Sequence, residues 1–267
     1  MSLPPRPAPS SLRRGGRWSV STLVVLAMWW SVTATGIGPT GLLDGRAGGA
    51  RLVRAFLRPD LSPDLLRVVI AATVETLHIS IAGLLIAVTL GLPLAAMIAG
   101  NLQLPSAVQR AAILVAASLR GVPELLWALV FVAMVGLGPA AGVYAIGIHG
   151  AGLLAKLASE QLEAVDPAPV EAVRMVGAGR IATSALAIVP QARPGLASLI
   201  LYLWECNIRT ATVVGFVGAG GIGAALDIAL RLFRYQELST LVLAVLGLIL
   251  AVDGLSRAVR GRVGIIP

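Results

Sequence analysis

Charged side chains are scarce in this sequence. Only 13% of its 267 residues are Asp, Glu, Lys or Arg, while 57% are hydrophobic. A soluble domain carries about 25% charged residues, so too few polar groups remain to cover a water-soluble globule. The single cysteine, Cys206, excludes a disulfide within the chain. There is no cluster of metal ligands and no nucleophile beside a base, so we predict neither a metal site nor a catalytic site.

The charge that is present is basic, with 21 Lys and Arg against 13 Asp and Glu. Most arginines flank apolar runs, which favours anchoring in a membrane over binding to nucleic acid. The apolar runs reach the length of about 20 residues that one span needs. They predict an all-α integral membrane protein with six transmembrane helices, at residues 18–37, 68–99, 110–137, 140–157, 195–217 and from 238 to 252 onward.

The residues before the second span divide into three parts. Residues 1–17 are rich in Pro, Ser and Arg and predict a disordered cytoplasmic tail. Residues 18–37 form the first span, although a signal peptide is the alternative because a basic start precedes the apolar run. Residues 38–67 form an external segment in which Leu52, Val53 and Phe56 recur near helical spacing, which indicates an amphipathic helix on the membrane surface.

Residues 68–260 form the core domain, and residues 261–267 form the C-terminus. Arginines in the tail place the N-terminus in the cytoplasm, and six spans return the C-terminus to the same side. The five arginines in the external segment disagree with this orientation unless the amphipathic helix holds them at the membrane surface.

A polar segment at residues 165–190 interrupts the spans. Asp166 can cap a helix and Pro167 suits its first turn, while Gly177 and Gly179 end that helix and permit a sharp turn. A second short helix at 181–188 runs into Pro190. The pattern predicts a helix–turn–helix that displays small residues to a partner, and a plain polar loop is the alternative.

Three segments resemble one family. Glu171-Ala172, Gly177 and the downstream Ile-Val-Pro190 resemble the EAA loop of binding-protein-dependent ABC importer permeases, which docks into a groove on the cytosolic ATPase. The stretch 205–223, ECNIRTATVVGFVGAGGIG, resembles phosphonate importer permeases, and RGVPE at 120–124 resembles the entry to their third span. Val173 departs from the usual Ala or Leu but is also apolar. The resemblance covers residues 65–260.

This resemblance implies the type I ABC importer permease fold with a cytoplasmic coupling helix pair. It implies a homodimer in the bacterial inner membrane, two cytosolic ATPase subunits and an extracytoplasmic substrate-binding protein. The chain lacks a G-x-x-x-x-G-K-[ST] motif, so ATP and Mg²⁺ would lie on the ATPase and this chain would hold no cofactor. The expected coupling residues are Glu171, Ala172, Arg174, Gly177, Ala178 and Pro190.

The cargo implied by the resemblance is phosphonate or a related oxyanion such as phosphite or phosphate, and the residues do not choose among them. An ion-coupled secondary transporter or a channel for a small anion is the alternative. Both readings need a path through the membrane. We expect its lining to include Glu205, Asn207, Arg209, Thr210 and Thr212.

Charged groups within spans cost about 2.5–3.5 kcal/mol each on insertion. Arg120 and Glu124 are four residues apart, as are Glu205 and Arg209, so each pair can neutralise itself on one helix face. The other interpretation is that Arg209, with Asn207, offers donors to a phosphorus oxyanion. The spacing alone does not decide between these two interpretations.

Four glycines, Gly218, Gly220, Gly221 and Gly223, follow the fifth span and include a literal G-x-G-x-x-G. A dinucleotide site would need a βαβ unit and an acidic residue about 20 positions on, and Glu237 comes too early. We instead expect a tight loop at the outer mouth of the path, where the backbone passes close to the partner protomer or the binding protein.

Overall fold

The computed structural model describes residues 11–36 and 46–262, and every regular element within these ranges is a helix. The chain divides into two units, residues 1–54 and 55–267. The first unit holds α1 (Ser11–Ala34) and most of α3 (Arg46–Leu57). The helix expected between residues 38 and 67 is therefore confirmed, and its position on a membrane surface stays a prediction.

The predicted disordered tail is wrong over residues 11–17, because α1 begins at Ser11. Once an apolar run has nucleated a helix, each further residue adds a hydrogen bond at little cost, so the helix extends into the polar flank. Residues 1–10 of that prediction lie outside the described part of the chain. The described apolar part of α1 is Val20–Ala34, which is shorter than 18 residues.

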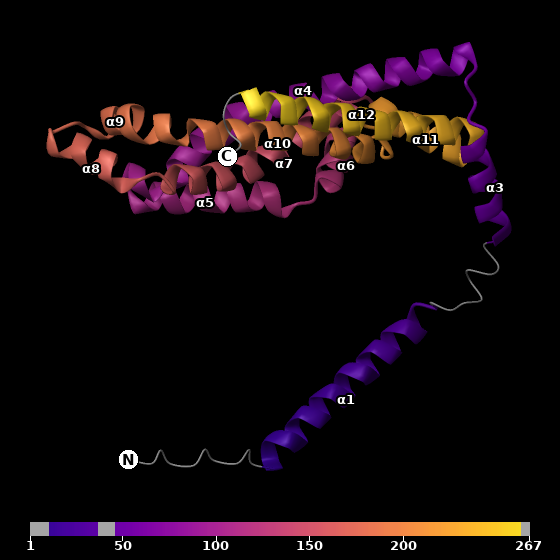
Figure 1. Cartoon of the computed structure of the whole chain (residues 1–267), viewed down its shortest axis with the longest axis horizontal. Coiled ribbons are helices and arrows are strands. Elements are labelled where there is room, and N and C mark those ends of the chain that lie inside the picture. The colour runs from indigo at the N-terminus through magenta and orange to yellow at the C-terminus, as the bar shows by residue number, and fades with distance from the viewer. Residues whose placement is uncertain (1–10, 37–45, 263–267) are drawn as a thin grey trace. The chain divides into compact units, whose positions relative to one another are not determined.

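The second unit contains the remaining helices (Figure 1). They are α4 (Pro63–Ile98), η1 (Gly100–Leu102), α5 (Ser106–Gly121), α6 (Glu124–Val135), α7 (Pro139–Glu163), α8 (Pro167–Met175), α9 (Arg180–Thr183), the π turn η2 (Ser184–Ile188), α10 (Val189–Gly215), α11 (Gly221–Arg231) and α12 (Tyr235–Arg262). By length and hydropathy, α4, α7, the run 180–215 and α12 can each cross a membrane, and α5 with α6 would supply a fifth span.

The third expected span is not straight. Helices α5 and α6 meet at an angle of 85°. Val122, which precedes Pro123, has φ −88° and ψ 123°. A proline disfavours helical dihedrals in the residue before it, so the helix ends at Gly121 and restarts at Glu124.

The fifth expected span begins earlier than residue 195. Helices α9, η2 and α10 form one helical run from Arg180 to Gly215, with Pro190 and Pro194 inside it. The separate short helix expected at 181–188 is therefore the start of this run. A π turn lies directly before Pro190, and its wider backbone gives room for a ring that would otherwise clash with the preceding turn.

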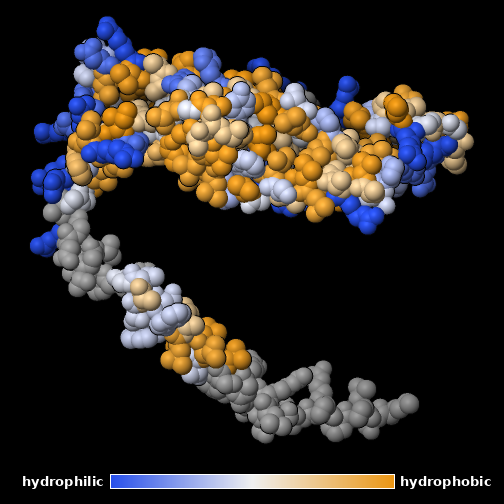
Figure 2. Space-filling model, turned by 180° about the vertical axis from the view of Figure 1, so that it is seen from behind, coloured by the Kyte–Doolittle hydropathy of each residue, from blue (hydrophilic) through white to orange (hydrophobic). Residues whose placement is uncertain are grey.

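The core of the second unit lies around α7, which packs along α4 and also contacts α5, α6 and α10. Small residues allow the close approach. A Cβ added to Gly147 would lie 2.7 Å from Cβ of Ile86, and one added to Gly91 would lie 2.9 Å from the carbonyl oxygen of Ala151. Membrane helices commonly pack through such small residues. Hydrophobic residues cover the middle of this unit and hydrophilic ones gather towards its ends (Figure 2), as a membrane-spanning body requires.

Candidate translocation path and coupling surface

The segment 165–190 folds into a hairpin at one end of the second unit (Figure 1). Oδ1 of Asp166 accepts a hydrogen bond of 2.9 Å from the backbone N–H of Ala168, so the predicted N-cap of α8 is confirmed. Gly177 turns the chain with φ +83°. The tip exposes three large apolar side chains: Met175 (82%), Val176 (83%) and Ile181 (87%).

One face of α8 is anchored to the spans. Nη2 of Arg174 donates a 2.6 Å hydrogen bond to the carbonyl oxygen of Asn101, just after α4. Val170 is buried at 5% exposure and belongs to a core cluster that includes Ile188. Glu171 and Ala172 are exposed on the same helix. The hairpin therefore offers a free outer surface while its inner face is held by the core.

The other expected coupling residues lie near this hairpin. Thr183 donates a 3.4 Å hydrogen bond to the carbonyl oxygen of Ala178. Pro190 is exposed and begins the long part of α10. Pro190 also lines an apolar cavity of about 690 Å³ beside α9, with Arg180 and Arg193 in its wall.

The residues expected to line the path all lie on α10 but face different surroundings. Asn207 is buried, and its Nδ2 donates to the carbonyl oxygen of Ser80 on α4 at 3.3 Å. Thr212 is buried and donates to the carbonyl oxygen of Ile208 at 3.2 Å. The Asn207 side chain therefore joins α10 to α4, while the Thr212 hydroxyl bonds only within α10. Thr210 is half-buried and has no hydrogen bond within the described residues.

Glu205 and Arg209 instead line a cavity of about 240 Å³ between α10 and α12. The rest of its wall consists of Ile208, Ile249, Leu250, Val252 and Asp253. Sequence reasoning missed Asp253, which precedes the terminal arginines by less than two helical turns. Its position one helical turn before Arg257 was the sequence signal that could have identified it.

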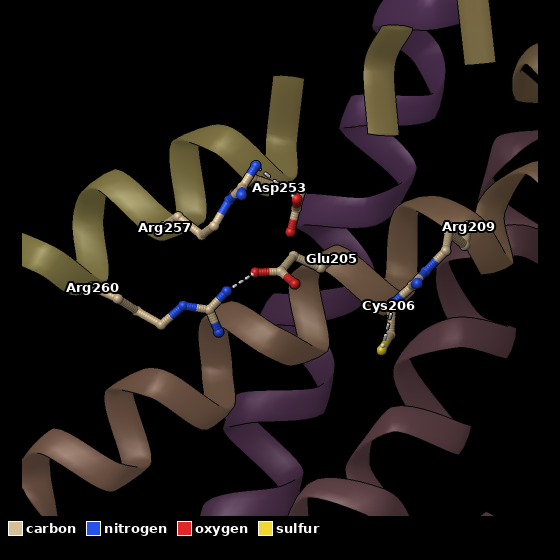
Figure 3. A network of polar contacts seen from close by, with 6 residues as sticks. All are labelled: Glu205, Cys206, Arg209, Asp253, Arg257 and Arg260. Carbon is tan, nitrogen blue, oxygen red and sulfur yellow. Dashed lines mark hydrogen bonds and ion pairs between the residues drawn. The ribbon is translucent and has the colours of Figure 1, made fainter. Parts of the chain in front are cut away.

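Of the two interpretations of Glu205 and Arg209, the pairing within one helix is not formed. Glu205 instead forms an ion pair with Nη2 of Arg260 on α12 (Figure 3). Helical side chains point back toward the N-terminal end of their helix, so Arg260 reaches toward the middle of α10. Asp253 pairs with Arg257 at 3.1 Å. Among the described residues no carboxylate pairs with Arg209, whose Nη2 lies 3.5 Å from Sγ of Cys206.

The expected charge pair of Arg120 and Glu124 is also not formed. The break at Pro123 places the two residues on different helices, so their spacing of four no longer puts them on one face. Oε2 of Glu124 lies 3.7 Å from Nε2 of His149 on α7, and Nδ1 of His149 lies 3.0 Å from the carbonyl oxygen of Val122. Arg120 is exposed.

The glycine loop is tightly packed within this chain. Gly218, Gly220 and Gly221 all have positive φ. A Cβ on Gly220 would lie 2.8 Å from Oε1 of Glu75, and one on Gly221 would lie 2.7 Å from Oγ1 of Thr76. The loop backbone therefore lies close to α4 of the same chain, and its expected approach to the partner protomer or the binding protein stays a prediction.

Gly223 also packs inside the chain, where its Cα would lie 2.6 Å from a Cβ added to Gly215. The backbone N–H of Gly138 donates to the carbonyl oxygen of Gly218 at 2.8 Å. Helix α10, and not a strand, precedes the loop. The G-x-G-x-x-G match thus spans the turn after α10 and the first turn of α11.

Apolar spans, a charged cavity between two of them and a surface hairpin define a membrane transport component. Residues 87–265 match the binding-protein-dependent transport system inner membrane component family, and the chain belongs to it. It is a permease subunit of the ABC importer class.

Relatives are consistent with the predicted branch of this class. The chain is 39% identical over 248 residues to the phosphite transport system permease protein PtxC of Stutzerimonas stutzeri, covering 93% of this chain and 89% of that protein. It is 39% identical over 194 residues to the phosphate-import permease protein PhnE of Mycolicibacterium smegmatis, covering 72% of this chain and 36% of that protein.

The fold has counterparts among solved structures. The MetNI methionine ABC transporter in an inward-facing conformation superposes with a TM-score of 0.69 at 18% identity, covering 76% of this chain and 99% of that chain. Together with the family match, this confirms the expected type I importer permease fold. A secondary transporter or channel is not favoured.

Proposed function

We propose that this chain forms the translocation path of an ATP-driven importer for phosphonate, phosphite or phosphate. The observation that carries the proposal is Arg209, which lines the cavity between α10 and α12 without a carboxylate partner among the described residues. Relatives at 39% identity are named for phosphite and phosphate. A guanidinium offers paired donors that suit a phosphorus oxyanion, and a single such contact lets the anion leave again.

The proposed assembly contains two copies of this chain, two cytosolic ATPase subunits that hold ATP and Mg²⁺, and an extracytoplasmic binding protein. It lies in the bacterial inner membrane with six spans per copy and both termini in the cytoplasm. Exposed apolar side chains at the hairpin tip support docking to another protein, since such patches mark interaction surfaces. Glu171, Ala172, Gly177 and Ala178 would contact the ATPase.

Energy would enter as motion of the hairpins. Closure of the two ATPase subunits on ATP would move the two copies of α8 toward each other. Arg174 joins α8 to the end of α4, and the run 180–215 joins α9 to α10 without interruption. Movement of the hairpin would therefore reach the spans and switch the side on which the path is open.

The test is reconstitution of the purified chain in liposomes with its binding protein, with and without its copurifying ATPase, followed by uptake of radiolabelled phosphate, phosphite and methylphosphonate. Uptake that requires both ATP and the ATPase supports the proposal. Full uptake by this chain alone contradicts it.

A matched pair of arginine variants tests the path. Arg209→Gln should abolish uptake of all three anions while the complex still assembles. Arg231→Gln is the control, because Arg231 lies on α11 and pairs with Asp227 at 2.7 Å on its own helix. Equal uptake by the two variants would remove Arg209 from the path.

A further inference from the structure

Glu205 lies within reach of two arginines that come from different helices. Arg260 of α12 forms its present ion pair, and the side chains of Arg260 and Glu205 are only 17% and 13% exposed. Arg209 follows Glu205 by four residues on α10 (Figure 3). An acidic residue four positions before a cation is the favourable order for an ion pair on one helix. Glu205 therefore has a second partner available without leaving α10.

The charges around the cavity are unequal in number. The network in Figure 3 contains the carboxylates of Glu205 and Asp253 and the guanidinium groups of Arg209, Arg257 and Arg260. Arg260 neutralises Glu205 and Arg257 neutralises Asp253. Arg209 is left with only a thiol contact, so the cavity keeps one positive charge while α12 stays beside Glu205.

Separation of α10 from α12 would reverse this distribution. Glu205 is largely buried, and a buried carboxylate without a cation is strongly unfavourable. Arg257 lies on α12 and would move away together with Arg260, so Glu205 would pair with Arg209 on the adjacent turn of α10. The positive charge at the cavity would then be cancelled.

We propose that Glu205 exchanges between Arg260 and Arg209 during transport, and that this exchange sets the affinity of the path for its anion. With Glu205 on Arg260, Arg209 binds the oxyanion. With Glu205 on Arg209, the carboxylate displaces it. The inference rests on the proposed function, since it needs an anion at Arg209. It explains how a fixed cation in the membrane can hold a dianion and still release it.

Three variants of the full importer in liposomes test the exchange by phosphite uptake. Arg260→Gln leaves Glu205 only Arg209 as a partner, so uptake should fall by at least about tenfold, the scale of a broken buried charge pair. Adding Glu205→Gln to Arg260→Gln removes the competitor and should raise uptake to the level of Glu205→Gln alone. Glu205→Gln alone should lower the KM for phosphite and the maximal rate together, because the anion binds but leaves slowly.

Arg257→Gln is the matched control. It breaks an ion pair on α12 without removing a partner of Glu205, and it should leave uptake within about twofold of the unaltered protein, as expected for a partly exposed pair. Assembly of each variant is checked by gel filtration and by the basal ATPase rate.

The outcomes separate the exchange from the function beneath it. If the unaltered importer carries no phosphorus oxyanion, or if Arg209→Gln is fully active, the proposed function fails and the exchange fails with it. If the importer does carry the anion and Arg209→Gln is inactive, but the double variant is as inactive as Arg260→Gln, the ion pair is only structural. In that case the exchange is wrong and the proposed function stands.

Discussion

His149 on α7 lies 3.7 Å from Glu124 on α6, measured from Nε2 to Oε2. The other ring nitrogen, Nδ1, lies 3.0 Å from the carbonyl oxygen of Val122 in the break between α5 and α6. His149 thus contacts both the backbone carbonyl of Val122 at the break and the first carboxylate of the new helix. These two contacts tie α7 to the 85° bend, so His149 braces it.

Replacing His149 by Ala should destabilise the bend. The carbonyl of Val122 and the carboxylate of Glu124 would lose their partner, at a cost of about 1–3 kcal/mol. Thermal unfolding in detergent should show a lower midpoint, and proteolysis should become faster near the break. His78→Ala is the control, because His78 is exposed on α4. Equal midpoints for the two variants would contradict the bracing role.

Gly215→Ala should disrupt the glycine loop. The new Cβ would lie 2.6 Å from both the Cα of Gly223 and the carbonyl oxygen of Gly220, and such overpacking costs about 1–3 kcal/mol. We expect less folded protein in membranes and a lower unfolding midpoint. Gly247→Ala on α12 meets no atom within 4 Å and should be neutral, so a matching loss there would argue against tight packing as the cause.

Thr76→Val tests a hydrogen bond between α4 and α11. Oγ1 of Thr76 accepts a 2.8 Å bond from the buried N–H of Ile222, and valine would leave that donor unsatisfied at a cost of about 1–3 kcal/mol. Thr73→Val removes only a bond to the carbonyl oxygen of Val69 within the same helix. The unfolding midpoint of Thr76→Val should therefore fall further than that of Thr73→Val, and the reverse order would refute the assignment.

Changes at the hairpin tip should uncouple ATP hydrolysis from uptake. Glu171 is exposed, so Glu171→Arg should leave the fold intact while opposing docking. Gly177→Asp adds a charge at a turn with φ +83°. A loss of about 2 kcal/mol or more at the centre of an interface lowers coupling over tenfold. Gly179→Ala is the control, with φ −68° and open space around it. Normal uptake with normal ATPase stimulation in the first two variants would remove the hairpin from coupling.

Much of the fold follows from local properties of the sequence. Hydropathy over about 20 residues located the long helices α4, α7, α10 and α12, because lipid demands apolar runs of that length. It missed α11, which lies where the sequence predicted a loop. The N-cap of α8 was also predictable, since Asp166 and Ala168 are near neighbours. The prolines were harder, because Pro123 ends a helix while Pro190 and Pro194 do not.

The difference between those prolines depends on residues distant in sequence. At Pro123, the carbonyl oxygen of Val122 lies 3.0 Å from Nδ1 of His149, which is 27 residues further along the chain. The charge partners were missed for the same reason. Glu205 and Arg260 are 55 residues apart, and spacing within one helix says nothing about a neighbour supplied by another.

The helical run from Arg180 to Gly215 would carry the proposed movement of the hairpin into the spans. Its 36 residues correspond to about 54 Å at 1.5 Å per residue. The π turn at Ser184–Ile188 departs from α-helical geometry within this run, and it lies close to the hairpin end. A small displacement of the hairpin tip would bend the run at this turn and move α10 sideways. Glu205 and Arg209 lie on α10, well past the π turn, where this displacement would be larger than at the turn itself.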